Sequence, residues 1–287
     1  MRVTSHFVPS RPSCRQKRRG EGDPVNIVIF GANGPTGRLA AEQASTEGHT
    51  VTAVTRRPKE FPVIGPRVRV VEADVLDPAA VDRGVAGQDA VISALGVPYG
   101  RSPVSVYSVG VSHITQAMTK HGVRRIVGVT STVLFGTAAP GETFLFRRVL
   151  EPSVVRFMGR TVYDDMRRME EVVRESDLDW TVVRPGGLFD RDGVSDYRVG
   201  TERLPGRYTA RADLAHELLR QAVDDGHLRA FVDVRTTQDT PSFLDLLRNE
   251  AFSGKGGKRG KRGKRGSEKG TGTGTGSFPV GRRTWSG

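Results

Sequence analysis

Three evenly spaced glycines, Gly31, Gly34 and Gly37, form the pattern in this sequence that points most directly to chemistry. They follow an apolar, β-branched run at residues 26–30 and precede a helical pattern that includes Leu39. A glycine turn between a strand and a helix lets backbone N–H groups reach a phosphate, which the positive end of the helix also attracts. The pattern predicts a phosphate-binding turn, and the alternative is a glycine-rich turn before an ordinary helix.

Two arginines, Arg56 and Arg57, follow a second apolar run at residues 50–55. In NAD-binding proteins an acidic residue near this point usually binds the ribose 2′-hydroxyl. Here the acid is absent, and a guanidinium group matches a 2′-phosphate through charge-assisted hydrogen bonds. The pair favours NADP, with NAD as the less favoured cofactor; the alternative is that both arginines are solvated surface charges.

Strand-like and helix-like segments alternate along the middle of the chain. The expected strands are residues 26–30, 50–55, 68–72, 90–94, 125–130, 180–183 and 230–234. The expected helices are residues 37–47, 78–86, 104–121, 161–176 and 211–224. This alternation predicts an α/β fold, a single Rossmann-type doubly wound parallel sheet of six or seven strands flanked by helices. Ligands of such sheets bind at the carboxyl ends of the strands.

The formal net charge of +12 lies almost entirely in the two ends of the chain. Residues 24–252 carry 28 basic and 29 acidic side chains, whereas the two ends are basic and contain few apolar residues. We therefore expect a disordered basic head (1–23), one NAD(P)-binding domain with an integral acceptor pocket (24–245), and a disordered Gly/Lys/Arg/Thr-rich tail (246–287). The neutral body predicts no specific nucleic-acid binding and leaves nonspecific polyanion contact to the tail.

The cysteine content and the hydropathy exclude several classes of site. The one cysteine, Cys14, lies in the head, so disulfides, thiol nucleophiles and cysteine-based metal sites are excluded from the body, and no metal is expected. No run of 18 apolar residues occurs, which predicts no membrane partner. We expect a cytoplasmic protein, a monomer or weak dimer, whose partner is a small molecule.

Several motifs together resemble one protein family. They are GANGPTG after NIVIF, the arginine after the second strand, EADVLD (72–77), GQDAVISALG (87–96), VTS (129–131), YDDMRRMEEVVRES (163–176) and LDWTVVRPGGL (178–188). The set resembles an atypical short-chain dehydrogenase/reductase of the NmrA-like, NAD(P)-binding kind. Within that family it is most similar to the biliverdin reductase B/flavin reductase branch, over residues 25–240.

The resemblance implies a set of cofactor-binding residues. They are Gly31, Asn33, Gly34, Thr36, Gly37, Arg56, Arg57, Asp74, Val75, Ala94, Leu95, Gly96, Pro185, Gly186 and Leu188. It implies that Asp74 accepts a hydrogen bond from the adenine amine and that Val75 packs on the ring. Residues 94–96 would pass beneath the ribose and pyrophosphate, and residues 185–188 would lie beside the nicotinamide. For Asp74 the alternative is a turn or N-cap carboxylate before Pro78.

The resemblance also assigns catalytic candidates. It places Ser131 at the family's active-site serine, where a hydroxyl can orient an acceptor against the nicotinamide; the alternative is a serine that caps its own loop. The family's Tyr-x-x-x-Lys pair is altered here: Tyr163 with Arg167 is the less favoured dyad, and an ungapped count places Val162 and Met166 at the family positions. The acidic residues of this helix are interpreted as a solvated face: Asp164, Asp165, Glu170 and Glu171.

Two functions follow from the resemblance. The first is an NAD(P)H-dependent oxidoreductase, preferring NADPH, that reduces a small flavin-, quinone- or carbonyl-type acceptor. The second is a catalytically silent NADP-binding sensor or regulatory protein of the NmrA-like type. Ser131 favours the enzyme, and Met166 favours the sensor because a thioether cannot transfer a proton. The loop at residues 135–160 is expected to cover the acceptor pocket.

Overall fold

The structure is a computed structural model that describes residues 23–98, 100, 102–135, 159–238 and 240. Residues 1–22 of the head, the whole tail and nearly all of the loop at residues 135–160 lie outside the described residues. The interpretation of these three segments, and the domain boundary at residues 245/246, therefore stay predictions.

Eight strands form one sheet in the order β3-β2-β1-β4-β5-β6-β10-β8. They are β1 (Asn26–Phe30), β2 (Thr50–Thr55), β3 (Val68–Glu72), β4 (Ala90–Ser93), β5 (Arg125–Val129), β6 (Asp179–Pro185), β8 (Tyr197–Gly200) and β10 (Ala230–Thr236). The seven predicted strands are parallel, which confirms the doubly wound fold. The eighth strand, β8, is an addition to the prediction and runs antiparallel to β10 at the edge.

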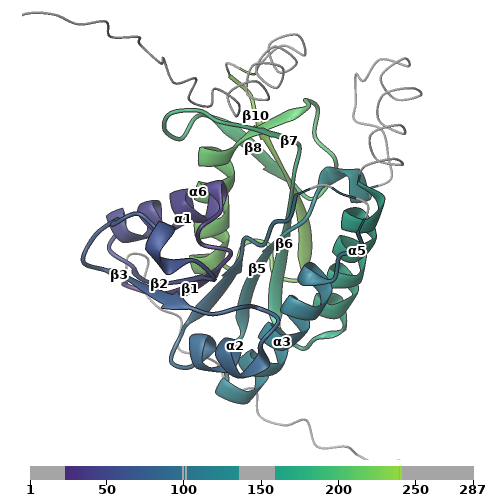
Figure 1. The fold of residues 1–287 in the computed structure, drawn as a ribbon. Coiled ribbons are helices and arrows are strands. Elements are labelled where there is room, and N and C mark those ends of the chain that lie inside the picture. Colours follow the sequence, from purple (N-terminus) through teal and green to yellow (C-terminus); the bar gives the residue numbers. More distant parts are fainter. Residues whose placement is uncertain (1–22, 99, 101, 136–158, 239, 241–287) are drawn as a thin grey trace, which may run out of the picture. The chain divides into compact units, whose positions relative to one another are not determined.

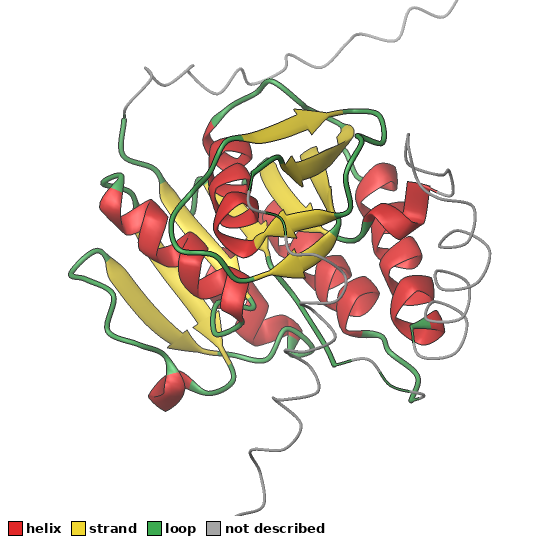
Figure 2. Ribbon diagram, turned by 90° about the horizontal axis from the view of Figure 1, so that it is seen from above, coloured by secondary structure: helices red, strands yellow, loops and turns green. Residues whose placement is uncertain are grey.

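Helices cover both faces of the sheet (Figures 1 and 2). The first face carries α1 (Pro35–Thr46) and α6 (Arg211–Val223), and the second carries α2 (Pro78–Val85), α3 (Val106–His121) and α5 (Arg160–Glu175). Central strands such as β1 and β4 are mostly apolar because both of their faces are buried under helices. Each face has its own hydrophobic core.

The chain reverses its direction across the sheet between β1 and β4. From β1 the strands proceed outward through β2 to β3, and from β4 they proceed the opposite way through β5 and β6. At such a switch point the loops after the two strands diverge to opposite faces and leave a crevice for a ligand. The segment after β1, residues 31–34, and the segment after β4, residues 94–98, border this point.

Residues 187–210 contain three short strands instead of a plain connection. Besides β8, β7 (Gly187–Phe189) pairs in parallel with β9 (Tyr208–Ala210) in a separate two-stranded sheet. Thr209 anchors this sheet: its hydroxyl donates to the Val234 carbonyl at 2.6 Å and accepts from the Gly186 N–H at 3.0 Å. The segment that follows β6 is thereby tied to β10.

Candidate functional site

The glycine turn fits closely against the end of β4. Gly31 has φ +77°, a left-handed conformation that favours glycine, and a Cβ there would collide with the Ala94 carbonyl. A Cβ at Gly37 would collide with the Gly31 carbonyl and the Ala32 backbone. These two glycines therefore allow the sharp turn off β1 and the close packing of α1 against it.

The N-terminus of α1 has polar groups that are suited to an anion. Gly34 is the N-cap and supplies no side-chain acceptor, and the first turn contains no acidic residue. The first-turn N–H groups of a helix have no acceptor within the helix, and Thr36 lies in that turn. The buried amide nitrogen of Asn33 also lacks a hydrogen-bond partner among the described residues. A phosphate at this turn would satisfy such donors.

Arg38 braces the turn from the first helix, a contact that the sequence analysis missed. Its Nε donates to the Asn33 side-chain oxygen at 3.0 Å, and its Nη2 donates to the Glu60 carbonyl at 2.9 Å. Glu60 ends η1 (Pro58–Glu60), the short 3-10 helix that follows β2. The signal in the sequence was an arginine directly after Gly37.

Arg56 and Arg57 lie exposed after β2. Arg56 approaches Asp74, which follows β3, with 3.9 Å between Nη1 and Oδ2, and Arg57 pairs with Glu60 at 3.0 Å. The two guanidinium side chains are 71% and 69% exposed, so both can rearrange around a ligand at low cost. Asp74 also accepts from the Leu76 N–H at 3.0 Å, which is the turn role named as its alternative.

Val75 and Leu95, two of the residues expected to contact the cofactor, pack toward the hydrophobic core. Val75 is 7% exposed, and its methyl groups fill the space beside Gly110 of α3, with the Leu95 side chain close by. Little Val75 surface remains for an adenine ring, so the expected packing of Val75 on that ring is not supported. Gly96, in contrast, is exposed, and a Cβ there would meet no atom within 4 Å.

Ser131 lies half-buried in the turn after β5. Its Oγ accepts from the Val133 N–H at 3.3 Å, the capping role named as the alternative. A hydroxyl that accepts still has its own proton to donate, so capping and orienting an acceptor are compatible. The neighbours of Ser131 are anchored: Thr130 donates to Glu170 at 2.7 Å, and Thr132, which opens η2 (Thr132–Phe135), donates to the Pro185 carbonyl at 3.2 Å.

Tyr163 and Arg167 lie in different environments on α5. Tyr163 is 7% exposed and packs in the core against Gly159. Arg167 is half-exposed and donates to Asp164 at 2.7 Å on the outer surface. The geometry therefore does not support a Tyr163–Arg167 dyad, in which a guanidinium group would have to act on the phenol.

The interpretation of the acidic residues of α5 as a solvated face was wrong for two of the four. Asp165 is fully buried and accepts from the Tyr107 N–H at the start of α3, at 2.9 Å. Glu170 is 4% exposed and forms a bidentate ion pair with Arg184 of β6, at 2.9 and 2.6 Å. Partners from other elements bury these two carboxylates, whereas Asp164 remains largely outside the core.

The loop after β6 packs tightly on its inner side. A Cβ at Gly186 would collide with the Arg235 guanidinium and the Arg207 carbonyl, so glycine is required there by packing. Leu188 is 37% exposed. Pro185 is buried and joins the Ser131 turn through Thr132, which brings the loops after β5 and β6 together.

A family model described as NAD(P)H-binding matches residues 31–225, from the first glycine of the turn to the end of α6. The chain belongs to this NAD(P)H-binding family. The match covers more than half of the chain and confirms the NAD(P)-binding part of the resemblance. The cofactor class is therefore a nicotinamide dinucleotide, and the uncapped α1, the Asn33 amide and the open space at Gly96 fit such a group.

Two curated proteins are similar to this chain over part of its length. An uncharacterized chloroplastic protein of Arabidopsis thaliana is 30% identical over 172 residues, which are 56% of this chain and 59% of that protein. A (4-alkanoyl-5-oxo-2,5-dihydrofuran-3-yl)methyl phosphate reductase of Streptomyces griseus is 30% identical over 159 residues, 55% of this chain and 46% of that protein. The chain thus spans about half of the length of these relatives.

Solved structures share the fold. A short-chain dehydrogenase/reductase from Veillonella parvula, in complex with NADP, has a TM-score of 0.62 at 21% identity and covers 76% of this chain and 99% of its own. ChuY, an anaerobillin reductase from Escherichia coli O157:H7, has a TM-score of 0.59 at 21% identity and covers 76% and 100%.

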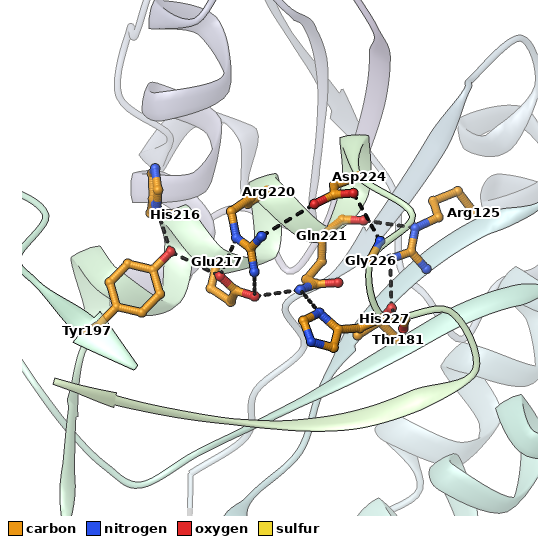
Figure 3. Close-up of polar contacts among 10 residues, drawn as sticks. All are labelled: Arg125, Thr181, Tyr197, His216, Glu217, Arg220, Gln221, Asp224, Gly226 and His227. Carbon is orange, nitrogen blue, oxygen red and sulfur yellow. Dashed lines mark hydrogen bonds and ion pairs between the residues drawn. The ribbon is translucent and has the colours of Figure 1, made fainter. Parts of the chain in front are cut away.

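A second polar cluster lies along α6 (Figure 3). Glu217, which is buried, accepts from Tyr197 at 3.0 Å and from Gln221 at 2.6 Å. Arg125 donates to the Gln221 carbonyl at 2.8 Å and to Thr181 at 2.7 Å, and burial lowers the pKa of Arg125 to about 10. Because Arg125 begins β5, this end of the cluster lies at the amino ends of the strands, opposite to their carboxyl ends, and joins α6 to the strands.

The described part of the chain contains neither a metal-binding cluster nor a membrane-spanning helix. Within it, no group of three or more His, Cys, Asp or Glu side chains is placed to hold a metal ion. Nor does any helix in that part have both the length and the apolar character needed to cross a membrane.

Proposed function

We propose that the protein is an NADPH-dependent reductase of a small flavin-, quinone- or carbonyl-type acceptor. The observation that carries the proposal is the switch point between β1 and β4, where the Gly31 turn packs against Ala94 and the uncapped N-terminus of α1 follows. Two similar proteins are named as reductases, one from Streptomyces griseus and one from Escherichia coli. Residues of the crevice would hold the cofactor along the carboxyl ends of β1 and β4.

Ser131 is the residue that we assign to the acceptor. Bound NADPH supplies a hydride, and the chain has to place the acceptor and exclude competing water. The Ser131 hydroxyl, held by the Val133 N–H, can donate its proton to a carbonyl oxygen or ring nitrogen of the acceptor. An easily reduced acceptor needs little beyond such placement.

A catalytically silent NADP-binding sensor is the second candidate. It is favoured by Val162 and Met166 of α5, which are 1% and 8% exposed. They occupy the positions where the family that the sequence resembles has tyrosine and lysine. Neither side chain can exchange a proton, so α5 supplies no general acid at these two positions.

Turnover separates the two candidates. The full chain, incubated with NADPH and a panel of flavins, quinones and aldehydes, should oxidise the cofactor with at least one acceptor, as followed by the loss of nicotinamide absorbance. Binding of NADPH without oxidation by any member of the panel would contradict the reductase and favour the sensor.

Replacing both Arg56 and Arg57 by alanine tests the preference for NADPH. The unchanged protein should bind NADPH at least about tenfold more tightly than NADH, because one charge-assisted hydrogen bond to the 2′-phosphate contributes roughly 1.5–3 kcal/mol. The double variant should bind both cofactors equally, with NADH affinity nearly unchanged, in parallel calorimetric titrations. Equal affinities in the unchanged protein would contradict the assignment of these arginines.

A further inference from the structure

Three buried polar side chains meet between α5 and the sheet. The Glu170 carboxylate accepts from the Thr130 hydroxyl at 2.7 Å and from Nε and Nη2 of Arg184 at 2.9 and 2.6 Å. Thr130, Glu170 and Arg184 are 4%, 4% and 7% exposed. Charge-assisted hydrogen bonds of this kind are short and directional, and removal of the carboxylate would leave a buried cation uncompensated.

Both partners of Glu170 are adjacent in sequence to residues of the candidate active site. Thr130 directly precedes Ser131, and Arg184 directly precedes Pro185. The two strand ends are also joined to each other, because the Thr130 N–H donates to the Val183 carbonyl at 3.0 Å. Glu170 therefore holds the last residues before both candidate loops against one helix.

Arg184 extends this contact to the far side of the Ser131 turn. Its guanidinium carbon lies 4.6 Å from the ring centre of Phe135 and 4.0 Å from that of Phe231. Phe135 ends η2, which begins immediately after Ser131. The turn is thus held at its start by the hydrogen bond from Thr130 to Glu170 and at its end by a cation–π contact with Arg184, the ion-pair partner of Glu170.

Glu170 lies on the buried face of α5. Val162, Met166 and Glu170 are spaced four residues apart and are all buried, so they share the face of α5 that is turned to the protein interior. The first two cannot donate or accept a proton. Glu170 is the member of this stripe that carries charge, and it lies one turn beyond Met166.

We propose that Glu170 is a positioning residue, which sets the orientation of the Ser131 turn and of the Pro185 loop through Thr130 and Arg184. Its effect on turnover rests on the proposed reductase function, whereas its effect on the order of the turn does not. Glu170 itself is assigned no contact with acceptor or cofactor.

Thr130→Val, compared with Thr130→Ser, tests this role. Valine has nearly the shape of threonine without the hydroxyl and leaves the Glu170–Arg184 ion pair intact, whereas serine keeps the hydroxyl and should restore the contact. In the full chain, amide hydrogen exchange of residues 131–135 should be about tenfold faster in Thr130→Val than in Thr130→Ser, while α6 is unchanged. For an acceptor that is reduced, kcat should fall about tenfold in the valine variant, with the KM for NADPH unchanged.

Glu170→Gln should give a larger change of the same kind. If the uncompensated charge of Arg184 prevents this variant from folding, the comparison of Thr130→Val with Thr130→Ser decides alone. Equal exchange of residues 131–135 in the valine and serine variants would overturn the proposal. Faster exchange with an unchanged kcat would overturn the effect of Glu170 on turnover. If the unchanged protein reduces no acceptor, the proposed function fails, and the exchange measurement still decides whether Glu170 orders the turn.

Discussion

Ser131→Ala should lower turnover of a reduced acceptor by about 10- to 100-fold, the loss expected when an orienting hydrogen bond of roughly 1.4–2.7 kcal/mol disappears from the transition state. The affinity for NADPH should not change, since Ser131 is assigned to the acceptor. The Val133 N–H, which now donates to Ser131, faces a half-exposed turn and can bond to water in the variant. Steady-state kinetics with NADPH and the best acceptor of the panel provide the measurement.

Tyr163→Phe is the matched control for this prediction. Tyr163 lies in the core, and Arg167 is held by Asp164 on the outer surface, so loss of the phenol hydroxyl should change turnover by less than about threefold. The reverse order, with a large loss in Tyr163→Phe and a small one in Ser131→Ala, would show that Tyr163 takes part in the reaction after all.

The sequence was sufficient to predict the framework of the fold. The runs IVIF (27–30) and AVI (90–92) are apolar throughout because helices cover both faces of the strands, and such runs are hard to mistake for surface segments. The glycine turn was equally readable, since the close contacts at Gly31 and Gly37 leave no room for a side chain. Local constraints of this kind appear directly in the residue types.

The burial of Glu170 and Asp165 could not be predicted from the sequence, because their partners are distant along the chain. The partner of Glu170 is Arg184 of β6, and Asp165 binds the start of α3, 57 or 58 residues away. A carboxylate on an amphipathic helix is normally solvated, so neither burial could be read from α5 alone. Strands β7 and β9 have three residues each, too short for a periodic pattern to appear.

Gly96 offers a direct test of whether the cofactor occupies the crevice. A side chain at this exposed position would project into open space, so Gly96→Val should alter the free energy of unfolding by no more than about 0.5 kcal/mol. We assign that space to the ribose and pyrophosphate of the cofactor, with which the isopropyl group of valine would collide. Gly226→Val is the control, because Gly226 is also exposed and lies at the far end of α6 (Figure 3).

The deciding measurement is calorimetric titration of NADPH into the full chain, Gly96→Val and Gly226→Val, with thermal unfolding recorded for each. We predict that the full chain and Gly226→Val bind NADPH with the same Kd, and that Gly96→Val loses at least about 100-fold in affinity, equivalent to about 2.7 kcal/mol, while its thermal stability is unchanged. Undiminished binding of NADPH by Gly96→Val, or no binding by the unchanged chain, would contradict the placement of the cofactor between β1 and β4.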